Sequence, residues 1–115
     1  MKDLDDIIEQ YEKDVLRTEN KDLQNPLTYG VMKLAEEAGE ACGIVGKHIG
    51  QGHGLVVYEL EEELGDALYF LTYVALKSGS SLHKVIQRNV IKRALRYPNG
   101  FDSARSQNRG QTTNV

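Results

Sequence analysis

Two stretches of sequence decide the fold of this chain: KLAEEAGEACGIVGK at residues 33–47 and ELEEELGDALYFL at residues 59–71. In both, apolar residues recur at steps of three and four, the spacing at which side chains share one face of a helix. The segment IGQGHG at residues 49–54 lies between them, and its three glycines favour a loop. The two stretches therefore predict a pair of helices joined by a short turn.

The same periodicity extends to both sides of this pair. It predicts a first helix from Asp3 to about Glu19, and a last one that follows a capping Ser81 and ends near Leu95. Thr28 is expected to cap the second helix, and the third is expected to run from about Leu55 to Lys77. There is no strand-like alternation of useful length. We therefore expect an all-α fold, a four-helix bundle.

Each central helix has a stripe of apolar residues that we expect to form the core. The stripe of the second helix consists of Val31, Leu34, Ala35, Ala38, Cys42, Val45 and Ile49. The stripe of the third consists of Leu60, Leu64, Ala67, Leu68, Leu71 and Ala75. ARSQNRGQTTNV, at the end of the chain, lacks apolar content. We expect residues 1–101 to form one domain and residues 102–115 a flexible tail.

Size and composition narrow the class of protein. The chain has 115 residues, 40% hydrophobic and 27% charged, which fits one globular domain with a small core that self-association would help to stabilise. Its longest apolar run, from Leu68 to Leu76, is shorter than the roughly 18 residues of a membrane span. A net charge of −3 argues against binding a nucleic acid polymer. The single cysteine fits the reducing cytoplasm.

Two acidic pairs indicate the chemistry. Glu37 with Glu40, and Glu63 with Asp66, are each spaced three residues apart on a predicted helix, so each pair shares one face. Carboxylates gathered in this way repel one another, and burying them unpaired costs several kcal/mol each. A divalent cation such as Mg²⁺ removes that cost and also accepts phosphate oxygens. The alternative from the residues alone is a set of solvated surface carboxylates.

These motifs resemble a known family. Glu36, Glu37 and Glu40 match the pattern E-E-x-x-E, and Glu63 and Asp66 match the E-x-x-D that follows it, in the MazG-like family of all-α nucleotide pyrophosphohydrolases. NVIKRALRYPNGF at residues 89–101 looks like the closing helix of that family. The resemblance covers about residues 27–101.

The resemblance implies a function. Members hydrolyse nucleoside triphosphates to the monophosphate and pyrophosphate with Mg²⁺, for which Mn²⁺ is a possible substitute. The substrates expected here are deoxynucleoside or modified nucleoside triphosphates. The implied metal ligands are Glu37, Glu40, Glu63 and Asp66. The implied catalytic residues are Glu36 and Glu37, with Glu36 orienting or deprotonating the attacking water or, alternatively, only paired with Lys33. Members assemble as homodimers or homotetramers.

The remaining candidates concern substrate binding. Asn89, Lys92 and Arg96 share one face of the last predicted helix, where they would contact the phosphates, sugar or base, or would instead form a solvated helix end. Lys47 matches a basic position of the family. Tyr29, Phe70 and Tyr73 are the aromatic candidates to stack on the base, with a place in the core as the alternative for Phe70 and the expected place of Tyr73.

Two other functions remain open on the sequence. One is a non-catalytic oligomerisation or adaptor module of the same fold. The other keeps the hydrolysis but changes the substrate to dUTP or phosphoribosyl-ATP, which related all-α enzymes handle.

Overall fold

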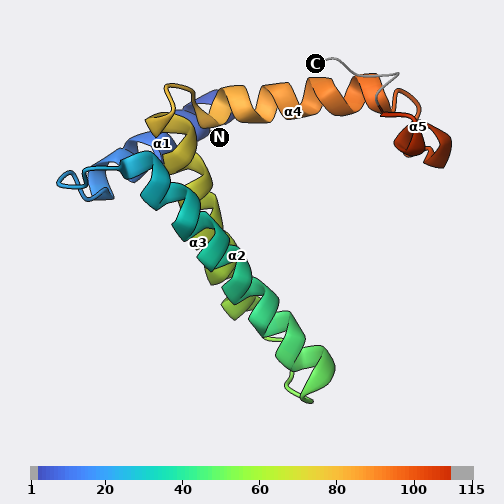
Figure 1. Cartoon of the computed structure of the whole chain (residues 1–115), viewed down its shortest axis with the longest axis horizontal. Helices are drawn as coiled ribbons and strands as arrows, with labels where there is room; N and C mark the ends of the chain where they lie inside the picture. The colour runs from blue at the N-terminus through green and yellow to red at the C-terminus, as the bar shows by residue number, and fades with distance from the viewer. Residues whose placement is uncertain (1–2, 110–115) are drawn as a thin grey trace. The chain divides into compact units, whose positions relative to one another are not determined.

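A computed structural model describes residues 3–109, which form helices and the segments that connect them. The elements are α1 (Leu4–Thr18), α2 (Pro26–Gly50), α3 (Val57–Lys77), α4 (Leu82–Arg96) and the short α5 (Ser103–Gln107) (Figure 1). No strand is present within residues 3–109, so the predicted all-α class is confirmed. Within the same range, no helix is both long enough and apolar enough to cross a membrane.

The contacts divide the chain into two units, one ending at Leu82 and the other beginning at His83. The first unit holds α1, α2 and α3, and the second holds most of α4 together with α5. Each unit is described by itself. The formation of a single domain by residues 1–101 therefore stays a prediction.

In the first unit, α2 and α3 form a hairpin and lie side by side along much of their length (Figure 1). α1 packs against α3. Few apolar side chains are buried in the described residues: Ile8, Val15, Tyr73, Ala75 and Leu82. The core is therefore small, and the contact between α2 and α3 is the most extensive contact between helices in it.

A glycine allows α2 and α3 to approach closely. A Cβ atom on Gly30 would lie 2.6 Å from Cδ1 of Tyr73 and 3.0 Å from Cγ2 of Val74. Both distances are shorter than ordinary contacts between carbon atoms. The ring of Tyr73 fills this space and is 2% exposed, as expected of a core residue. The absent side chain of Gly30 therefore sets how near the two helices lie at this level.

The predicted apolar stripe of α2 is not its buried face. Cys42 is exposed and Ile49 is 78% exposed, whereas the buried residues of α2 are Gly30 and Glu37. Leu64 and Leu68 of the α3 stripe are exposed as well. The prediction for α2 was wrong, because Gly30 and Glu37 rather than the apolar stripe are its buried residues. Most of the α2 stripe lies on the surface of the single chain, whereas Ala75 of the α3 stripe is buried, as predicted.

The ends of the helices differ slightly from the prediction. α2 begins at Pro26, before the expected cap Thr28, because proline has the backbone angle that the first turn of a helix needs. α3 begins at Val57, two residues after Leu55.

Part of the predicted tail is helical. The Asp102 side chain accepts hydrogen bonds from the backbone N–H groups of Ala104 and Arg105 at 2.9 and 3.2 Å, which caps α5. The last residues of the predicted tail, 110–115, lie outside the described residues.

The contact between Gly30 and Tyr73 gives a first prediction. Gly30→Ala should lower the free energy of unfolding by about 1–3 kcal/mol, because the new methyl group overpacks the helix contact. Gly43→Ala is the control on the same helix, since a Cβ atom there meets nothing within 4 Å. It should raise the stability by up to about 1 kcal/mol through helix propensity alone. Urea denaturation measures both, and equal effects in the two variants would contradict the close approach.

Candidate functional site

The α2–α3 hairpin brings the two predicted acidic pairs together. Carboxylate oxygens of Glu37, Glu63 and Asp66 all lie within 4.8 Å of one another. The same limit holds for carboxylate oxygens of Glu36, Glu37 and Glu40. Because the helices run in opposite directions from a short loop, the second half of α2 lies beside the first half of α3. The acids separated by the loop in sequence therefore form one cluster.

The cluster includes buried oxygens that lack a partner. Glu37 is only 8% exposed, and its Oε2 accepts no hydrogen bond from the described residues. Oε2 of the half-buried Glu63 is in the same situation. A buried carboxylate oxygen without a donor is costly, because it loses its water and gains nothing in exchange. Such oxygens fit a cation that the protein itself does not provide.

The crowding raises two pKa values. A hydrogen bond with Glu40, loss of water and the neighbouring negative charges together raise the pKa of Glu63 to about 7. Burial raises the pKa of Glu37, and the charges of Glu40 and Asp66 add to this effect. Lys33 acts in the opposite direction on the Glu37 pKa. The site therefore holds more negative charge than its own cations balance.

Lys33 forms ion pairs with two acids of the cluster. Its Nζ lies 2.9 Å from Oε2 of Glu36 and 3.8 Å from Oε1 of Glu37. It also lies 5.7 Å from the centre of the Phe70 ring. The ion pair between Glu36 and Lys33 is the alternative role that the sequence predicted for Glu36. It is compatible with Glu36 orienting or deprotonating a water molecule.

A pocket of about 470 Å³ opens beside the acids. It is lined by Thr18, Tyr29, Lys33, Glu37, Asp66, Tyr69 and Phe70. This volume falls within the range of roughly 300–1,000 Å³ that is usual for small-molecule sites. The rings of Tyr29 and Phe70 meet edge to face with their centres 6.1 Å apart. One end of the pocket is therefore acidic and another aromatic.

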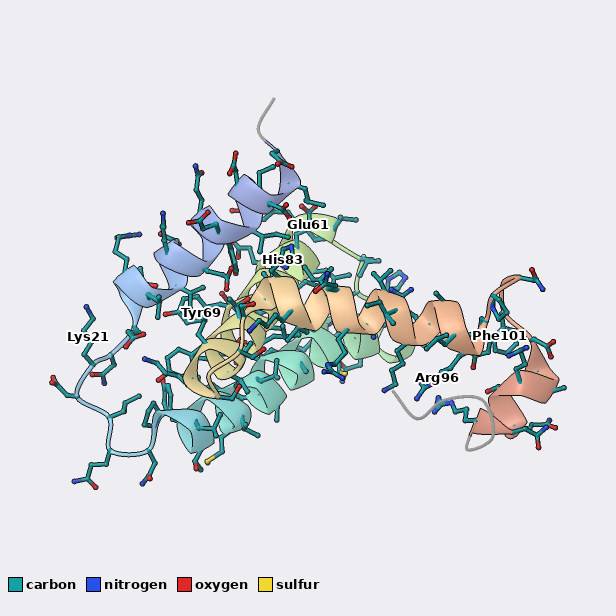
Figure 2. All side chains as sticks on the ribbon, turned by 90° about the horizontal axis from the view of Figure 1, so that it is seen from above. Lys21, Glu61, Tyr69, His83, Arg96 and Phe101 are labelled. Carbon is teal, nitrogen blue, oxygen red and sulfur yellow. The ribbon has the colours of Figure 1, made fainter. Side chains whose placement is uncertain are left out.

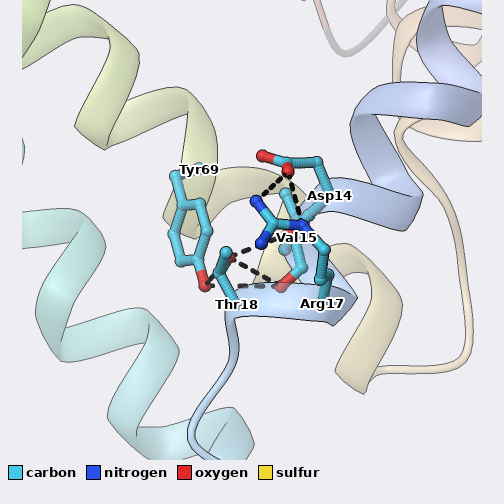
Figure 3. A network of polar contacts seen from close by, with 5 residues as sticks. All are labelled: Asp14, Val15, Arg17, Thr18 and Tyr69. Carbon is cyan, nitrogen blue, oxygen red and sulfur yellow. Dashed lines mark hydrogen bonds and ion pairs between the residues drawn. The ribbon is translucent and has the colours of Figure 1, made fainter.

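A polar network ties the pocket to α1. Tyr69 projects from α3 toward the end of α1 (Figure 2), and its hydroxyl oxygen lies 3.0 Å from that of Thr18. The Thr18 hydroxyl donates to the Asp14 carbonyl at 2.9 Å, and the Tyr69 hydroxyl donates to the Val15 carbonyl at 3.4 Å (Figure 3). Nη2 of Arg17 forms an ion pair with Oδ1 of Asp14 at 2.7 Å. The network fixes the C-terminal end of α1 at the edge of the pocket.

Sequence reasoning missed several lining residues. Tyr69 follows Asp66 by three residues and so shares its helix face, a signal that was present in the sequence. Thr18 carries no such signal, because it ends a different helix and reaches the pocket only through the packing of α1 on α3. Tyr73, placed in the core by the sequence, does not line the pocket.

The other predicted binding residues lie elsewhere in the chain. Lys47 is exposed in the last turn of α2, two turns beyond Glu40. Asn89, Lys92 and Arg96 are on α4, which belongs mainly to the second unit. There the Asn89 side-chain oxygen accepts from Nε of Arg93 at 3.0 Å. A role for these residues at the acidic cluster stays a prediction.

Comparison with known proteins gives one match. A model of the MazG nucleotide pyrophosphohydrolase domain matches residues 24–101, which is more than half of the chain. The matched range includes all the clustered acids. No curated protein and no solved structure matches the chain significantly.

The raised pKa of Glu63 gives a prediction for the metal-free protein. Between its ordinary value of 4.5 and about 7, the folded protein binds more protons at Glu63 than the unfolded chain does. This group therefore contributes stability that is present at low pH and lost as the pH rises through about 7. Glu63→Gln should remove this pH dependence, and Glu61→Gln, an exposed position on the same helix, should keep it.

Urea denaturation in the presence of EDTA, from pH 5 to pH 8, measures the effect. Parallel pH profiles for the wild-type protein and Glu63→Gln would contradict the crowding of charge at Glu63.

Proposed function

The chain belongs to the MazG nucleotide pyrophosphohydrolase family, and we propose that it hydrolyses nucleoside triphosphates to nucleoside monophosphate and pyrophosphate. The observation that carries the proposal is the acidic cluster, with its unpartnered buried oxygens, beside a pocket large enough for a nucleotide. Deoxynucleoside and modified nucleoside triphosphates are the proposed substrates.

The cluster fits a hard divalent cation. Its donors are carboxylate oxygens only, the type that Mg²⁺ and Mn²⁺ prefer, and it includes no histidine or cysteine. Glu37, Glu40, Glu63 and Asp66 would hold the ion. When bound, Mg²⁺ supplies positive charge that polarises the phosphoryl group and favours ionisation of a water molecule.

The side chains around the cluster divide the remaining tasks. Glu36 is on the same helix as Glu37 and one turn before Glu40, and its proposed role is to accept a proton from the attacking water. Phe70 and Tyr29 supply ring surfaces for the nucleobase.

Basic residues outside the pocket are proposed to complete substrate binding. Lys92 and Arg96 of α4 carry charges that suit the outer phosphates, and Asn89 carries an amide that can read the sugar or base. Lys47 is proposed in the same role from the end of α2.

We further propose that the chain works as a homodimer or homotetramer. Most of the apolar stripe of α2 is exposed in the single chain, as are Leu64 and Leu68 of α3 and Val85, Ile86, Val90 and Ile91 of α4. Apolar surface of this extent is usually covered by another subunit. A second copy of the chain would cover it and add to the small core.

The proposed reaction is tested by incubating the protein and Mg²⁺ with a panel of common and modified nucleoside triphosphates, including dUTP, and identifying the products. At least one substrate should give monophosphate and pyrophosphate. Release of single phosphate, or no turnover with any substrate, would contradict the proposed function.

Variants at the acids test the metal assignment within the same assay. Asp66→Asn and Glu37→Gln should each lower kcat/KM by at least about 100-fold, because even residues that only orient metal ligands cost 10–100-fold when removed. Glu61→Gln is the matched control, since it removes an exposed acid of α3 outside the cluster. Circular dichroism should show unchanged helicity in all three. Full activity in both cluster variants would exclude these ligands.

Light scattering tests the assembly. The expected mass is that of two or four chains of 12.9 kDa each. Leu64→Lys, on the exposed face of α3, should weaken the assembly while the helicity stays unchanged, because it places a charge on apolar surface. A stable monomer for the wild-type chain would contradict the proposal.

A further inference from the structure

The pocket beside the acids has an internal order along α2. Tyr29, Lys33 and Glu37 all line it, and they are spaced four residues apart, so they lie on successive turns of one helix face. Each step of four residues advances about 6 Å along a helix axis. The face therefore presents an aromatic ring, then a cation, then an acid.

α3 matches the two ends of this order from the opposite side. Phe70 lies near Tyr29, and Asp66, one turn away, lies near Glu37. A nucleoside triphosphate has a matching sequence of parts, with a flat apolar base at one end and charged phosphates at the other. With the base against these rings and the outer phosphates at the acids, the innermost phosphate would lie at the level of Lys33.

Among the described residues that line the pocket, Lys33 supplies the one positive charge. A lysine on a flexible stem is well suited to follow a phosphate oxygen. Its ion pair with Glu36 can exchange readily, because the Glu36 side chain is 53% exposed. Ion pairs open to solvent contribute little to stability, so leaving Glu36 for a phosphate costs little.

Resting on the function proposed above, we infer that Lys33 is a substrate-binding residue: it leaves Glu36 and binds the phosphate nearest the nucleoside. This exchange removes the cation from Glu36 when substrate enters. The Glu36 carboxylate is then free to accept a proton from water only when a nucleotide is in place. Binding of the substrate and preparation of the base are thereby coupled through one side chain.

The inference predicts opposite effects on two ligands when Lys33 loses its charge. Lys33→Met should weaken binding of a triphosphate by roughly 10- to 100-fold, the usual effect of losing one hydrogen bond to a charged group. The same change should strengthen binding of Mn²⁺ alone by about 2- to 10-fold, because Nζ lies near the Glu37 carboxylate and repels a cation there. Lys33→Arg, which keeps the charge, should resemble the wild-type protein in both measurements.

Calorimetry with the full chain measures both ligands. The triphosphate probes are the α,β-methylene analogues of the common deoxynucleoside triphosphates, which are not cleaved between those phosphates, each added with Mg²⁺. Lys13→Met is the matched control, because Lys13 is also paired with a glutamate on a helix, at 3.3 Å from Glu9, but lies outside the pocket. It should leave both affinities unchanged.

The outcomes separate the inference from the proposed reaction. Weaker binding of both ligands in Lys33→Met would show a structural role for Lys33 and overturn the inference. Unchanged triphosphate binding in that variant, or no binding of any analogue by the wild-type protein, would overturn it too. Opposite effects in a protein that cleaves no natural nucleotide would support Lys33 as a phosphate ligand and refute the proposed hydrolysis alone.

Discussion

The mutual repulsion of the carboxylates between α2 and α3 is the constraint around which this hairpin is built. Oxygens of three acids from two helices approach within 4.8 Å, and two buried oxygens have no donor. Like charges at this distance destabilise the folded chain unless protons or cations balance them. The remaining contacts of the first unit must hold the helices together against that repulsion.

Those contacts lie on α1 and at the end of the hairpin farthest from its loop. The ring of Tyr73 packs on the backbone of α2 at Gly30, and Lys77 of α3 forms an ion pair of 2.7 Å with Glu19 after α1. The Glu12 carboxylate accepts from the backbone N–H of Leu82 at 3.2 Å. Tight packing at the end of the hairpin farthest from its loop and charge near the middle divide structural and chemical roles along the same two helices.

Much of this arrangement could be predicted from the sequence. Helix positions follow from apolar periodicity, and the spacing of Glu37, Glu40, Glu63 and Asp66 predicts that they share helix faces. The buried face of α2 could not be predicted in this way, because its buried residues are Gly30 and Glu37 while most of its apolar stripe is exposed. Apolar periodicity shows which face of a helix is apolar. Where that face is exposed in the single chain, the periodicity does not identify the face that contacts the neighbouring helix. Thr18 was missed for a related reason, since only tertiary packing brings the end of α1 to the pocket.

The acids of the cluster all come from one helical hairpin, between Glu36 and Asp66, and this locality has a consequence for how the chain acquires its site. Contacts between segments close in sequence form quickly, because little chain entropy is lost in bringing them together. The loop at residues 51–56 contributes no acid to the cluster, so insertions there would lengthen a connection without altering the spacing of the acids on either helix. The geometry of the cluster therefore does not depend on the length of the loop. The hairpin is a unit that evolution or design can transfer between helical proteins.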